Sequence, residues 1–435
     1  MALPETGRDR ETLRQQMEAR QQGDADWAEG RTWSLVYSAG EEVHDVRDEA
    51  YREFASENAL NPLAFPSVLS FENEVVGMVA DMMNGQNAVG NVTSGGTESI
   101  LCASYAARER AREVDDVTDP TMVMAETAHP AWEKAAHYLG LEAIRTPTRD
   151  DWRADPDAIA GAIDDRTALV VASAPSYPHG VVDPVEEVAG IAADRGVLCH
   201  VDACIGGFVL PFLPELGYDV PAYDFSVEGV TSMSVDPHKY GYTAKGVSTV
   251  LYRDRELRRH QYYAFDGWPG GIYVAPNFQG TRPAGPIAAA WAVMNFLGRD
   301  GYEHLVADAM GAAEEIADHV AGHDDLAVVS DPDMSLLAIE STSADVNAWT
   351  VQRELSDDGW ELERQQRPES MHLSAMAQHA PVVEEFLADL EAAVDTARDA
   401  DTEEADAPLY GLSGSLDEDD EVTEALVDML NDVFV

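Results

Sequence analysis

The sequence predicts an α/β fold in which a mostly parallel sheet is flanked by helices and followed by a small C-terminal α+β domain. Short runs of β-branched residues alternate with stretches of helical periodicity over roughly 180 residues, a pattern typical of a parallel sheet. The apolar pattern changes near Gly301, where a second unit begins. At 435 residues the chain is long enough for one large domain and one smaller domain.

The large domain is expected over residues 61–300, after an N-terminal arm with helical parts over residues 1–60. Apolar residues at helical intervals from Phe71 to Met83 predict its first helix. Residues 90–93 then lead through two glycines into an alanine-rich helix over about 97–113. Helical stretches lie between several of the predicted strands, as parallel connections require. These strands are expected at residues 121–124, 168–173, 198–201, 232–235 and 248–252.

The small domain is expected over residues 301–435. Residues 399–421 are acidic and are interpreted as a solvated tail, and residues 422–435 as an amphipathic closing helix. The preceding pattern predicts a helix over 302–320, strands near 326–329 and 335–340, a helix near 346–357, a strand near 371–374 and a helix over 381–398.

The charge balance excludes several classes of partner. The chain has 81 Asp and Glu residues against 28 Lys and Arg, a net charge of −53. A surface of this charge repels nucleic acids and anionic membranes, so neither is an expected partner. Hydrophobic residues make up 45% of the chain and include eight Trp, which indicates a packed globule rather than a disordered chain. We interpret the acidity as a halophilic surface that stays soluble when counterions screen its self-repulsion.

The cysteine pattern and the chain start indicate a cytoplasmic protein. The three cysteines, Cys102, Cys199 and Cys204, have no CxxC spacing, so neither a disulfide framework nor a metal site is expected. The first 30 residues lack the apolar core of a signal peptide, and no run of about 18 apolar residues occurs. We therefore expect a soluble protein without a membrane anchor.

Three short segments carry residues suited to binding a charged small molecule. In the first, TSGGTES over residues 93–99, backbone N–H groups at two glycines and the hydroxyls of Ser94 and Thr97 can surround an anion at the start of a helix. An ordinary capped helix start explains the same pattern. The second segment places Asp202 at the end of a predicted strand, where its carboxylate can pair with a cation, a metal or a protonated ring nitrogen. A helix-capping or salt-bridged Asp is the alternative.

The third segment carries Lys239 after the next predicted strand, so Lys239 and Asp202 share one edge of the sheet if these strands are parallel. Burial in such a crevice lowers the pKa of a lysine and prepares its amine for Schiff-base chemistry. A solvent-exposed loop lysine is the alternative. The chain has only three lysines, Lys134, Lys239 and Lys245, so each is more informative than in a protein of ordinary composition.

Together the segments offer an anion cradle, a carboxylate for a ring nitrogen and an amine for an aldehyde. Pyridoxal 5'-phosphate (PLP) requires this set in order to act as an electron sink. The chain has no GxGxxG motif opening a strand–helix unit and no GxxxxGK[ST] motif, which disfavours dinucleotide and ATP binding.

Several stretches also resemble the group II PLP-dependent decarboxylases, and within them the sphingosine-phosphate lyase branch. The similarity covers most of the chain beyond about residue 30 and follows the family's motif order. The resemblance implies a fold-type I PLP enzyme that acts as a homodimer with a shared active site. The matching stretches are NVTSGGTESI (91–100), AHPAWEKAAHYLG (128–140), PHGVVDPVEEVA (178–189), LCHVDACIGGF (198–208), SMSVDPHKYGYTAKGVSTVLY (232–252) and DGWPGGIYVAPNFQGTRPAGP (266–286).

The resemblance also implies roles for single residues. Lys239 would form the Schiff base, Asp202 would hold the pyridine nitrogen protonated, and His129 would stack on the ring. Thr281 would reach the phosphate bound by a neighbouring subunit. The other implied contacts are Gly96, Thr97, Ser234 and His238 around the phosphate and Cys204 beneath the ring. Four of these residues have an alternative interpretation: His129 as a loop histidine, Ser234 as an ordinary strand residue, Thr281 as a turn-capping threonine and Cys204 as a small buried residue.

Two carbon–carbon lyase reactions fit this site. The first and preferred hypothesis is decarboxylation of an L-amino acid to its amine; the alternative is retro-aldol cleavage of a phosphorylated amino alcohol to an aldehyde. Lys239, released when the substrate amine replaces it, would carry protons in either case. An aminotransferase and a non-catalytic protein of the same fold are further alternatives.

Lys245 distinguishes the two reactions, because the lyase branch has a second lysine six residues after the Schiff-base lysine and uses it for the substrate phosphate. Tyr37 aligns weakly with another substrate contact of that branch. A surface lysine and a packed tyrosine are the alternatives. Two departures favour the decarboxylase: the branch has a longer histidine-containing loop after residues 61–63, and its animal and fungal members carry a membrane anchor.

Overall fold

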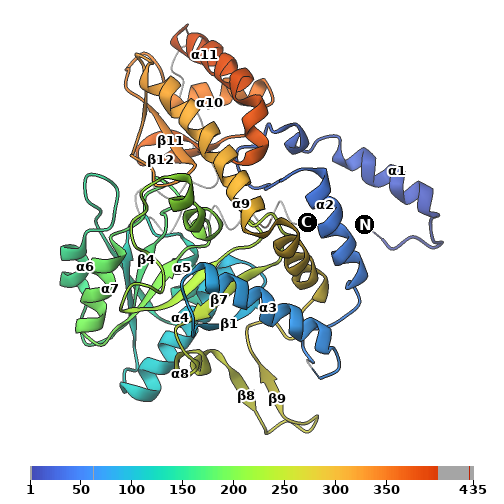
Figure 1. Ribbon diagram of the computed structural model, residues 1–435, viewed down its shortest axis with the longest axis vertical. Coiled ribbons are helices and arrows are strands. Elements are labelled where there is room, and N and C mark those ends of the chain that lie inside the picture. Colours follow the sequence, from blue (N-terminus) through green and yellow to red (C-terminus); the bar gives the residue numbers. More distant parts are fainter. Residues whose placement is uncertain (1, 62, 400–430, 432–435) are drawn as a thin grey trace.

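The computed structural model describes residues 2–61, 63–399 and 431. A large sheet lies in the body of the molecule, and a small domain with its own sheet lies above it (Figure 1). Nearly all of the predicted acidic tail and closing helix, residues 399–435, lies outside the described residues.

The large sheet has the strand order β1-β7-β6-β5-β4-β2-β3. Neighbouring strands from β6 to β3 are parallel, and β7 runs antiparallel to both β6 and β1. The prediction of a mostly parallel sheet is therefore confirmed, with β7 as the exception. The strands are β1 (Val89–Thr93), β2 (Thr121–Ala125), β3 (Glu142–Thr146), β4 (Thr167–Ser173), β5 (Leu198–Asp202), β6 (Val230–Val235) and β7 (Ser248–Tyr252).

The sequence pattern did not predict β1 and β3. β1 contains Gly90 and Asn91, residue types that are depleted in strands. Gly90 is required by the pairing itself, because a Cβ there would lie 2.3 Å from the carbonyl oxygen of Val250 on β7. β3 is an edge strand with Glu142 and Arg145 among its five residues, so it lacks the apolar run of a central strand.

Helices cover both faces of the large sheet, so its central strands are buried. Met122 and Met124 of β2 face α4 and α5, whereas Val123 and Ala125 of the same strand belong to the core under α3, α6 and α7. This alternation follows from the two-residue period of a strand. The covering helices are α3 (Pro66–Met82), α4 (Gly96–Val114), α5 (Ala131–Leu139), α6 (Pro156–Ala162) and α7 (Val185–Asp194).

The small domain has an antiparallel sheet of order β10-β11-β13-β12. The N-terminal segment takes part in it, because the N–H of Trp33 donates to the carbonyl of Glu361 and the N–H of Ser374 donates to the carbonyl of Trp33. The Trp33 ring is fully buried and stacks on His379 with centroids 3.9 Å apart. The domain comprises β10 (Leu326–Val328), β11 (Leu336–Ser341), α10 (Ala348–Asp357), β12 (Glu363–Gln366), β13 (Glu369–Ser374) and α11 (Val383–Asp399).

A long helix, α9 (Ala284–Ala321), joins the two domains (Figure 1). It bends at Gly298, whose φ of 60° is outside the helical range. The predicted helix 302–320 is its second half. Residues before the bend, such as Ile287, belong to the large core, and residues near its end, such as Ile316, belong to the core of the small domain.

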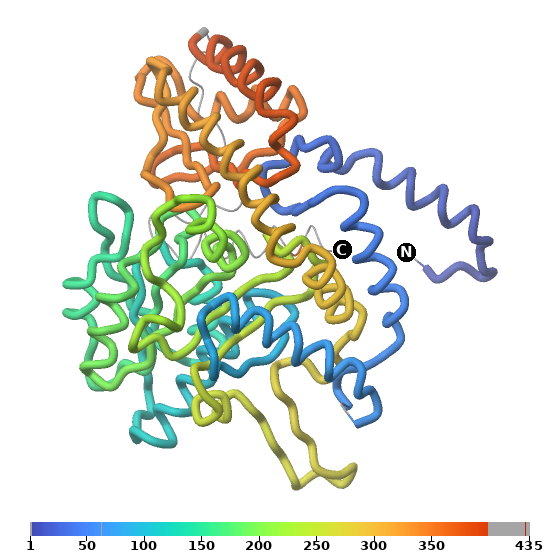
Figure 2. The backbone as a smooth tube through the Cα atoms, viewed as in Figure 1, coloured from blue at the N-terminus to red at the C-terminus, as the bar shows by residue number. Residues whose placement is uncertain are grey.

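Three segments lie at the periphery. α1 (Arg10–Gln21) has no buried residue and extends away from the body, whereas α2 (Glu41–Glu53) packs along α9 (Figure 2). The short helix α8 (Arg255–Arg258) leads into a hairpin of β8 (Tyr263–Phe265) and β9 (Tyr273–Ala275). This hairpin projects from the end of the molecule that lies opposite the small domain (Figure 2). Among the described residues, no helix combines the length and apolar character needed to cross a bilayer.

Candidate active site

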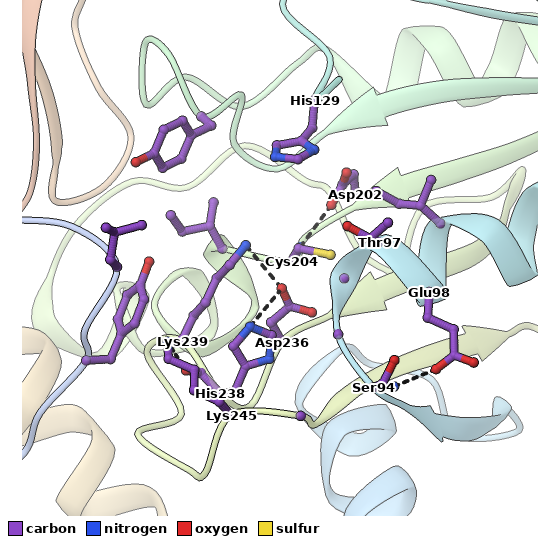
Figure 3. A pocket seen from close by; sticks show the side chains of 18 of the residues that line it. Ser94, Thr97, Glu98, His129, Asp202, Cys204, Asp236, His238, Lys239 and Lys245 are labelled. Atoms are coloured by element: carbon purple, nitrogen blue, oxygen red, sulfur yellow. Dashed lines mark hydrogen bonds and ion pairs between the residues drawn. The ribbon is translucent and has the colours of Figure 1, made fainter. Parts of the chain in front are cut away.

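A cavity of about 550 Å³ opens at the carboxyl edge of the large sheet (Figure 3). The ends of β1, β4, β5 and β6 all contribute to its wall, as expected where ligands bind to an α/β sheet. Tyr37 from the N-terminal segment and Glu363 from β12 add to it. Ten predicted residues line this one cavity: Tyr37, Ser94, Gly96, Thr97, His129, Asp202, Cys204, His238, Lys239 and Lys245.

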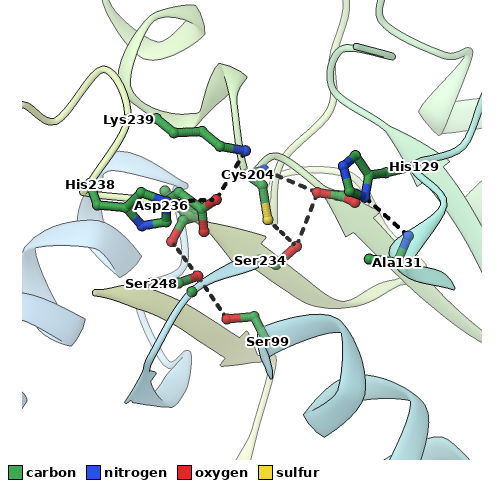
Figure 4. A network of polar contacts seen from close by, with 12 residues as sticks. Ser99, His129, Ala131, Cys204, Ser234, Asp236, His238, Lys239 and Ser248 are labelled. Carbon is green, nitrogen blue, oxygen red and sulfur yellow. Dashed lines mark hydrogen bonds and ion pairs between the residues drawn. The ribbon is translucent and has the colours of Figure 1, made fainter. Parts of the chain in front are cut away.

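Lys239 extends into the cavity from the turn after β6 (Figures 3 and 4). Its Nζ atom lies 3.1 Å from Oδ2 of Asp236, a carboxylate with only 1% of its side chain exposed. Burial acts to lower the pKa of Lys239, but the attraction of Asp236 outweighs it and the pKa is raised. The predicted lowering of this pKa is therefore wrong, because burial is opposed by the carboxylate of Asp236 three residues earlier.

Asp202 is held at the end of β5 by three hydrogen-bond donors. Its Oδ1 accepts from the backbone N–H of Cys204 at 3.1 Å and from the hydroxyl of Ser234 at 3.3 Å. Its Oδ2 accepts from the indole N–H of Trp132 at 3.1 Å. These contacts fix the plane of a carboxylate that faces the cavity.

Ser234 differs from its predicted place. It is fully buried and is not among the residues that line the cavity. Its hydroxyl contacts Sγ of Cys204 (Figure 4), Oδ1 of Asp202 and Nε2 of His200. In the parallel pair of β5 and β6, Ser234 is the register partner of Asp202, so the two side chains lie on the same face and contact each other. Ser234 therefore supports the carboxylate instead of lining the space for an anion.

The turn between β1 and α4 forms a cradle of backbone groups. α4 begins at Gly96 and its N-cap residue is Gly95, which has no side chain to satisfy the first N–H groups of the helix. A Cβ at Gly96 would lie 2.8 Å from Oδ2 of Asp236 and 2.9 Å from Sγ of Cys204, so only glycine permits this close approach.

Buried side chains hold the cradle in place. Oε2 of Glu98 accepts from the N–H of Ser94 at 2.7 Å, and Oε1 accepts from the N–H of Phe278 at 3.1 Å. Behind the turn, the hydroxyl of Ser99 lies 2.6 Å from that of Thr93 and 2.7 Å from that of Ser248 (Figure 4). The shape of the cradle is thus set before any ligand binds.

Two histidines line the cavity in the neutral form. Burial lowers the pKa of both His129 and His238. Nδ1 of His129 accepts from the N–H of Ala131 at 3.1 Å, which leaves the proton on Nε2. Nδ1 of His238 donates to the carbonyl of Val247, and its Nε2 lies 3.9 Å from Oδ2 of Asp236.

Lys245 and Tyr37 lie together on the cavity wall. Nζ of Lys245 is 4.8 Å from the centroid of the Tyr37 ring, a cation–π contact. The Lys245 side chain retains access to solvent, yet partial desolvation and the charge of Lys239 lower its pKa to about 8. The amine is therefore mainly cationic at neutral pH.

The residues present fit the predicted cofactor. The cradle supplies N–H donors for a phosphate, Asp202 supplies a fixed carboxylate, and Lys239 supplies an amine in the same cavity. Thr281 lies outside this cavity, exposed, and its hydroxyl accepts from the amide of Asn58 at 3.5 Å. Its predicted role needs a neighbouring subunit and stays a prediction.

Several residues of the site were not predicted, among them Asp236, Trp132, Tyr177 and Glu363. Asp236 lies within the matching stretch 232–252, and its position three residues before Lys239 was the available signal. Trp132 lies within the matching stretch 128–140, but its contact with Asp202 is made only in the folded chain. Tyr177 and Glu363 reach the cavity through tertiary packing, and nothing in their local sequence indicates it.

Residues 25–341 match the family model described as the pyridoxal-dependent decarboxylase conserved domain. A sphingosine-1-phosphate lyase of Arabidopsis thaliana is 40% identical over 443 residues, which cover 99% of this chain and 81% of that protein. An L-aspartate/L-glutamate decarboxylase of Pyrococcus horikoshii is 30% identical over 317 residues, which cover 73% of this chain and 81% of that protein.

Solved structures show the same relationship. A sphingosine-1-phosphate lyase of Burkholderia pseudomallei superposes with a TM-score of 0.91 at 33% identity, covering 100% of this chain and 97% of that one. A glutamate decarboxylase of Lactobacillus brevis superposes with a TM-score of 0.82 at 19% identity, covering 93% of this chain and 96% of that one, and so shares the fold.

Proposed function

Because the chain belongs to the pyridoxal-dependent decarboxylase family and is a PLP-dependent carbon–carbon lyase, we propose that it cleaves a phosphorylated amino alcohol into an aldehyde and a phosphorylated amine. The substrate class is that of the sphingosine-1-phosphate lyases, which match this chain at 34–40% identity. This is the alternative of the two predicted reactions, and the comparisons favour it over amino-acid decarboxylation.

The observation that supports the proposal is the position of Lys245. Its amine lies against Tyr37 on the wall of the cavity and donates to the carbonyl of His238, so it offers a phosphate a cation in addition to the N–H groups at the start of α4. A phosphate ester carries close to two negative charges at pH 7 and is attracted to such a cation. The α-carboxylate of an amino acid does not require a second phosphate site.

The protein's own residues have separate roles in the reaction. When bound, PLP serves as the electron sink for the bond that breaks. Asp202, fixed by Trp132, faces the cavity from the end of β5, where the resemblance places the ring nitrogen. His129 presents its Nε2–H to the cavity, and Lys239 carries a proton to or from the carbon that bears the amine.

Amino-acid decarboxylation has weaker support. The matching decarboxylase of Pyrococcus horikoshii is 30% identical and covers 73% of this chain, whereas the plant lyase is 40% identical and covers 99%. The decarboxylase structure superposes at 19% identity, which supports the fold alone.

A substrate panel tests the proposal. The protein saturated with PLP is incubated with sphingosine-1-phosphate, with its dephosphorylated form and with L-amino acids, and aldehyde, amine and carbon dioxide are measured. We expect aldehyde from the phosphorylated amino alcohol only. Carbon dioxide from an amino acid, without aldehyde from any panel member, would reverse the assignment.

Lys245→Ala and Lys134→Ala form a matched pair of variants. Both lysines lie over a tyrosine ring, Lys245 over Tyr37 and Lys134 over Tyr138, but Lys134 is not part of the cavity wall. We expect Lys245→Ala to raise KM about tenfold or more, as the loss of one charged contact implies, and Lys134→Ala to leave it unchanged. Equal KM values for the two variants would remove the support that Lys245 gives.

A further inference from the structure

Glu363 is a carboxylate in the cavity wall to which the family resemblance assigned no role. It comes from β12 of the small domain, whereas the other acidic groups of the site come from the large domain. Its Oε2 accepts a hydrogen bond of 2.6 Å from the hydroxyl of Tyr177, which lines the same cavity. A short contact of this kind between a phenol and a carboxylate is a charge-assisted hydrogen bond.

The direction of this hydrogen bond leaves Tyr177 ready to accept a proton. The phenol donates its only proton to Glu363, so the lone pairs of its oxygen remain available to the cavity. Burial and the neighbouring Glu363 raise the pKa of Tyr177, so the phenol stays neutral at physiological pH. Tyr177 can therefore take a proton only if it passes its own to Glu363.

A buried histidine stands behind the carboxylate. His372 lies directly opposite Glu363 in the β12–β13 pair, is completely buried, and donates from Nε2 to the carbonyl of Tyr177 at 3.0 Å. Its Nδ1 has no hydrogen-bond partner among the described residues and lies 4.0 Å from Oε2 of Glu363. Because burial lowers the pKa of His372 to about 4, Nδ1 keeps a lone pair that can accept a hydrogen bond from a protonated Glu363.

We propose that Glu363 is the proton store of the cleavage reaction and takes up, through the hydroxyl of Tyr177, the proton of a substrate hydroxyl on the carbon next to the amine-bearing carbon. This inference rests on the proposed function, because the aldehyde product requires a hydroxyl at that position of the substrate. Glu363 acts through Tyr177 and is a positioning residue of the reaction, supplied by the small domain.

The proton and electron balance of the step is complete. The substrate O–H proton passes to the oxygen of Tyr177 while the phenol proton passes to Oε2 of Glu363. The O–H electron pair forms the C=O bond of the aldehyde, the carbon–carbon bond breaks, and its electron pair remains with the amine-bearing carbon. That carbon later takes up one proton, which restores the ionised Glu363, so no external oxidant, reductant or water is consumed.

The test uses Glu363→Gln, in which the side-chain amide oxygen still accepts the hydrogen bond of Tyr177 but cannot store a proton. On sphingosine-1-phosphate we expect kcat to fall about 100-fold or more, the usual size of a general acid–base contribution, with KM within about threefold. Glu363→Asp should recover part of kcat. Glu369→Gln, at the other end of the same strand pair and bonded to Asn347, is the matched control and should keep the wild-type kcat.

A binding measurement separates a proton store from a structural bridge. The wild type, Glu363→Gln and Tyr177→Phe are titrated by calorimetry with an analogue of sphingosine-1-phosphate that lacks the hydroxyl beside the amine-bearing carbon. We expect the three proteins to bind it within about threefold of one another, because the missing hydroxyl is the group on which the pair acts. Glu363→Gln, which keeps an acceptor for the hydroxyl of Tyr177, should also keep the wild-type melting temperature.

Each outcome decides one question. An unchanged kcat in Glu363→Gln, or a loss of analogue binding or melting temperature that accounts for the loss of kcat, overturns the inference. Absence of aldehyde with the wild-type protein overturns the proposed function instead, because that result precedes any comparison of variants.

Discussion

Nζ of Lys239 and Oδ2 of Asp236 lie 3.1 Å apart in a single turn at the end of β6, which makes Asp236 the direct control on the charge of the reactive amine. The pair keeps Lys239 protonated and in place within the cavity. It also makes the charge of the cavity depend on a side chain that is almost completely buried.

The Asp236→Asn variant should react with PLP at lower pH than the wild-type protein does. Without the carboxylate, burial dominates and the pKa of Lys239 falls, and each unit of decrease raises the neutral fraction of the amine about tenfold. Because the pKa of Lys239 is raised on folding, the pair stabilises the folded state at every pH below the unfolded-state pKa of about 10.4. The free energy of unfolding of the variant should therefore also fall by about 3 kcal/mol at pH 7. The measurement is the rate of the visible absorbance change when PLP is added to the cofactor-free protein across a pH series. An unchanged pH profile would contradict the role of Asp236.

Glu98→Gln should weaken PLP binding. Glu98 accepts from two backbone N–H groups, and one of them would face the N–H₂ group of glutamine. We expect a roughly tenfold higher Kd for PLP, measured by absorbance titration of the cofactor-free protein. Asp224→Asn is the control, because Asp224 is also a buried carboxylate with two amide donors, the N–H of Ser226 and Asn84, but lies away from the cavity. Equal Kd values for both variants would mean that the cradle does not depend on Glu98.

The KM for a phosphorylated substrate should rise as the pH passes through about 8. The pKa of Lys245 is lowered to about 8, so its positive charge is present below that pH and is lost above it. Lys245→Arg keeps its charge over this range and should move the rise in KM to higher pH. Steady-state KM values on both sides of pH 8 check this. A rise at the same pH in the arginine variant would exclude Lys245 as its cause.

Mixing two inactive variants tests whether Thr281 acts across a dimer. In a hybrid of Lys239→Ala and Thr281→Ala subunits, one site would lack both groups and the other would contain both. The two variants are denatured and refolded together, and we expect each hybrid dimer to regain PLP binding with normal affinity at one of its two sites, while the dimers of a single variant regain none. If PLP binding by the mixture equals that of the separate variants, Thr281 acts on the cofactor of its own subunit or does not contact a cofactor.

Stability should increase with salt concentration. The net charge of −53 destabilises the compact state by self-repulsion, and counterions screen this repulsion. We expect the melting temperature and the activity to rise between about 0.1 M and about 2 M potassium chloride, where the Debye length falls from about 10 Å to a few Å. Indifference to salt in both measurements would require another explanation of the acidic composition.

Much of the architecture could be predicted from the sequence, because the short, mostly apolar runs of β4, β5 and β7 have the length and burial of central strands. The carboxyl ends of β5 and β6 then place Asp202 and Lys239 at one edge, which residue order alone indicated. β1 escaped prediction because Gly90 and Asn91 form a strand only where β7 pairs with them.

The site residues that were not predicted depend on contacts between positions far apart in the sequence. Glu363 and Tyr177 are separated by 186 positions, and no local pattern relates them. The predicted direction of the Lys239 pKa shift was wrong for a different reason. Burial lowers this pKa and the charge of Asp236 raises it, and only the distance between the two groups decides which effect is larger. The place of Ser234 depends on the pairing of β6 with β5, which sets its hydroxyl beside Asp202, and residue order alone does not give that pairing.

The place of Trp33 has a consequence for protein engineering. Its backbone is hydrogen-bonded to Glu361 and Ser374 in the small domain, and only four residues later Tyr37 reaches the cavity. Two residues of the cavity wall, Tyr37 and Glu363, are therefore positioned by one structural unit that is discontinuous in sequence. A chimera that exchanges the C-terminal domain between relatives must also exchange residues 31–37, because this segment packs against that domain.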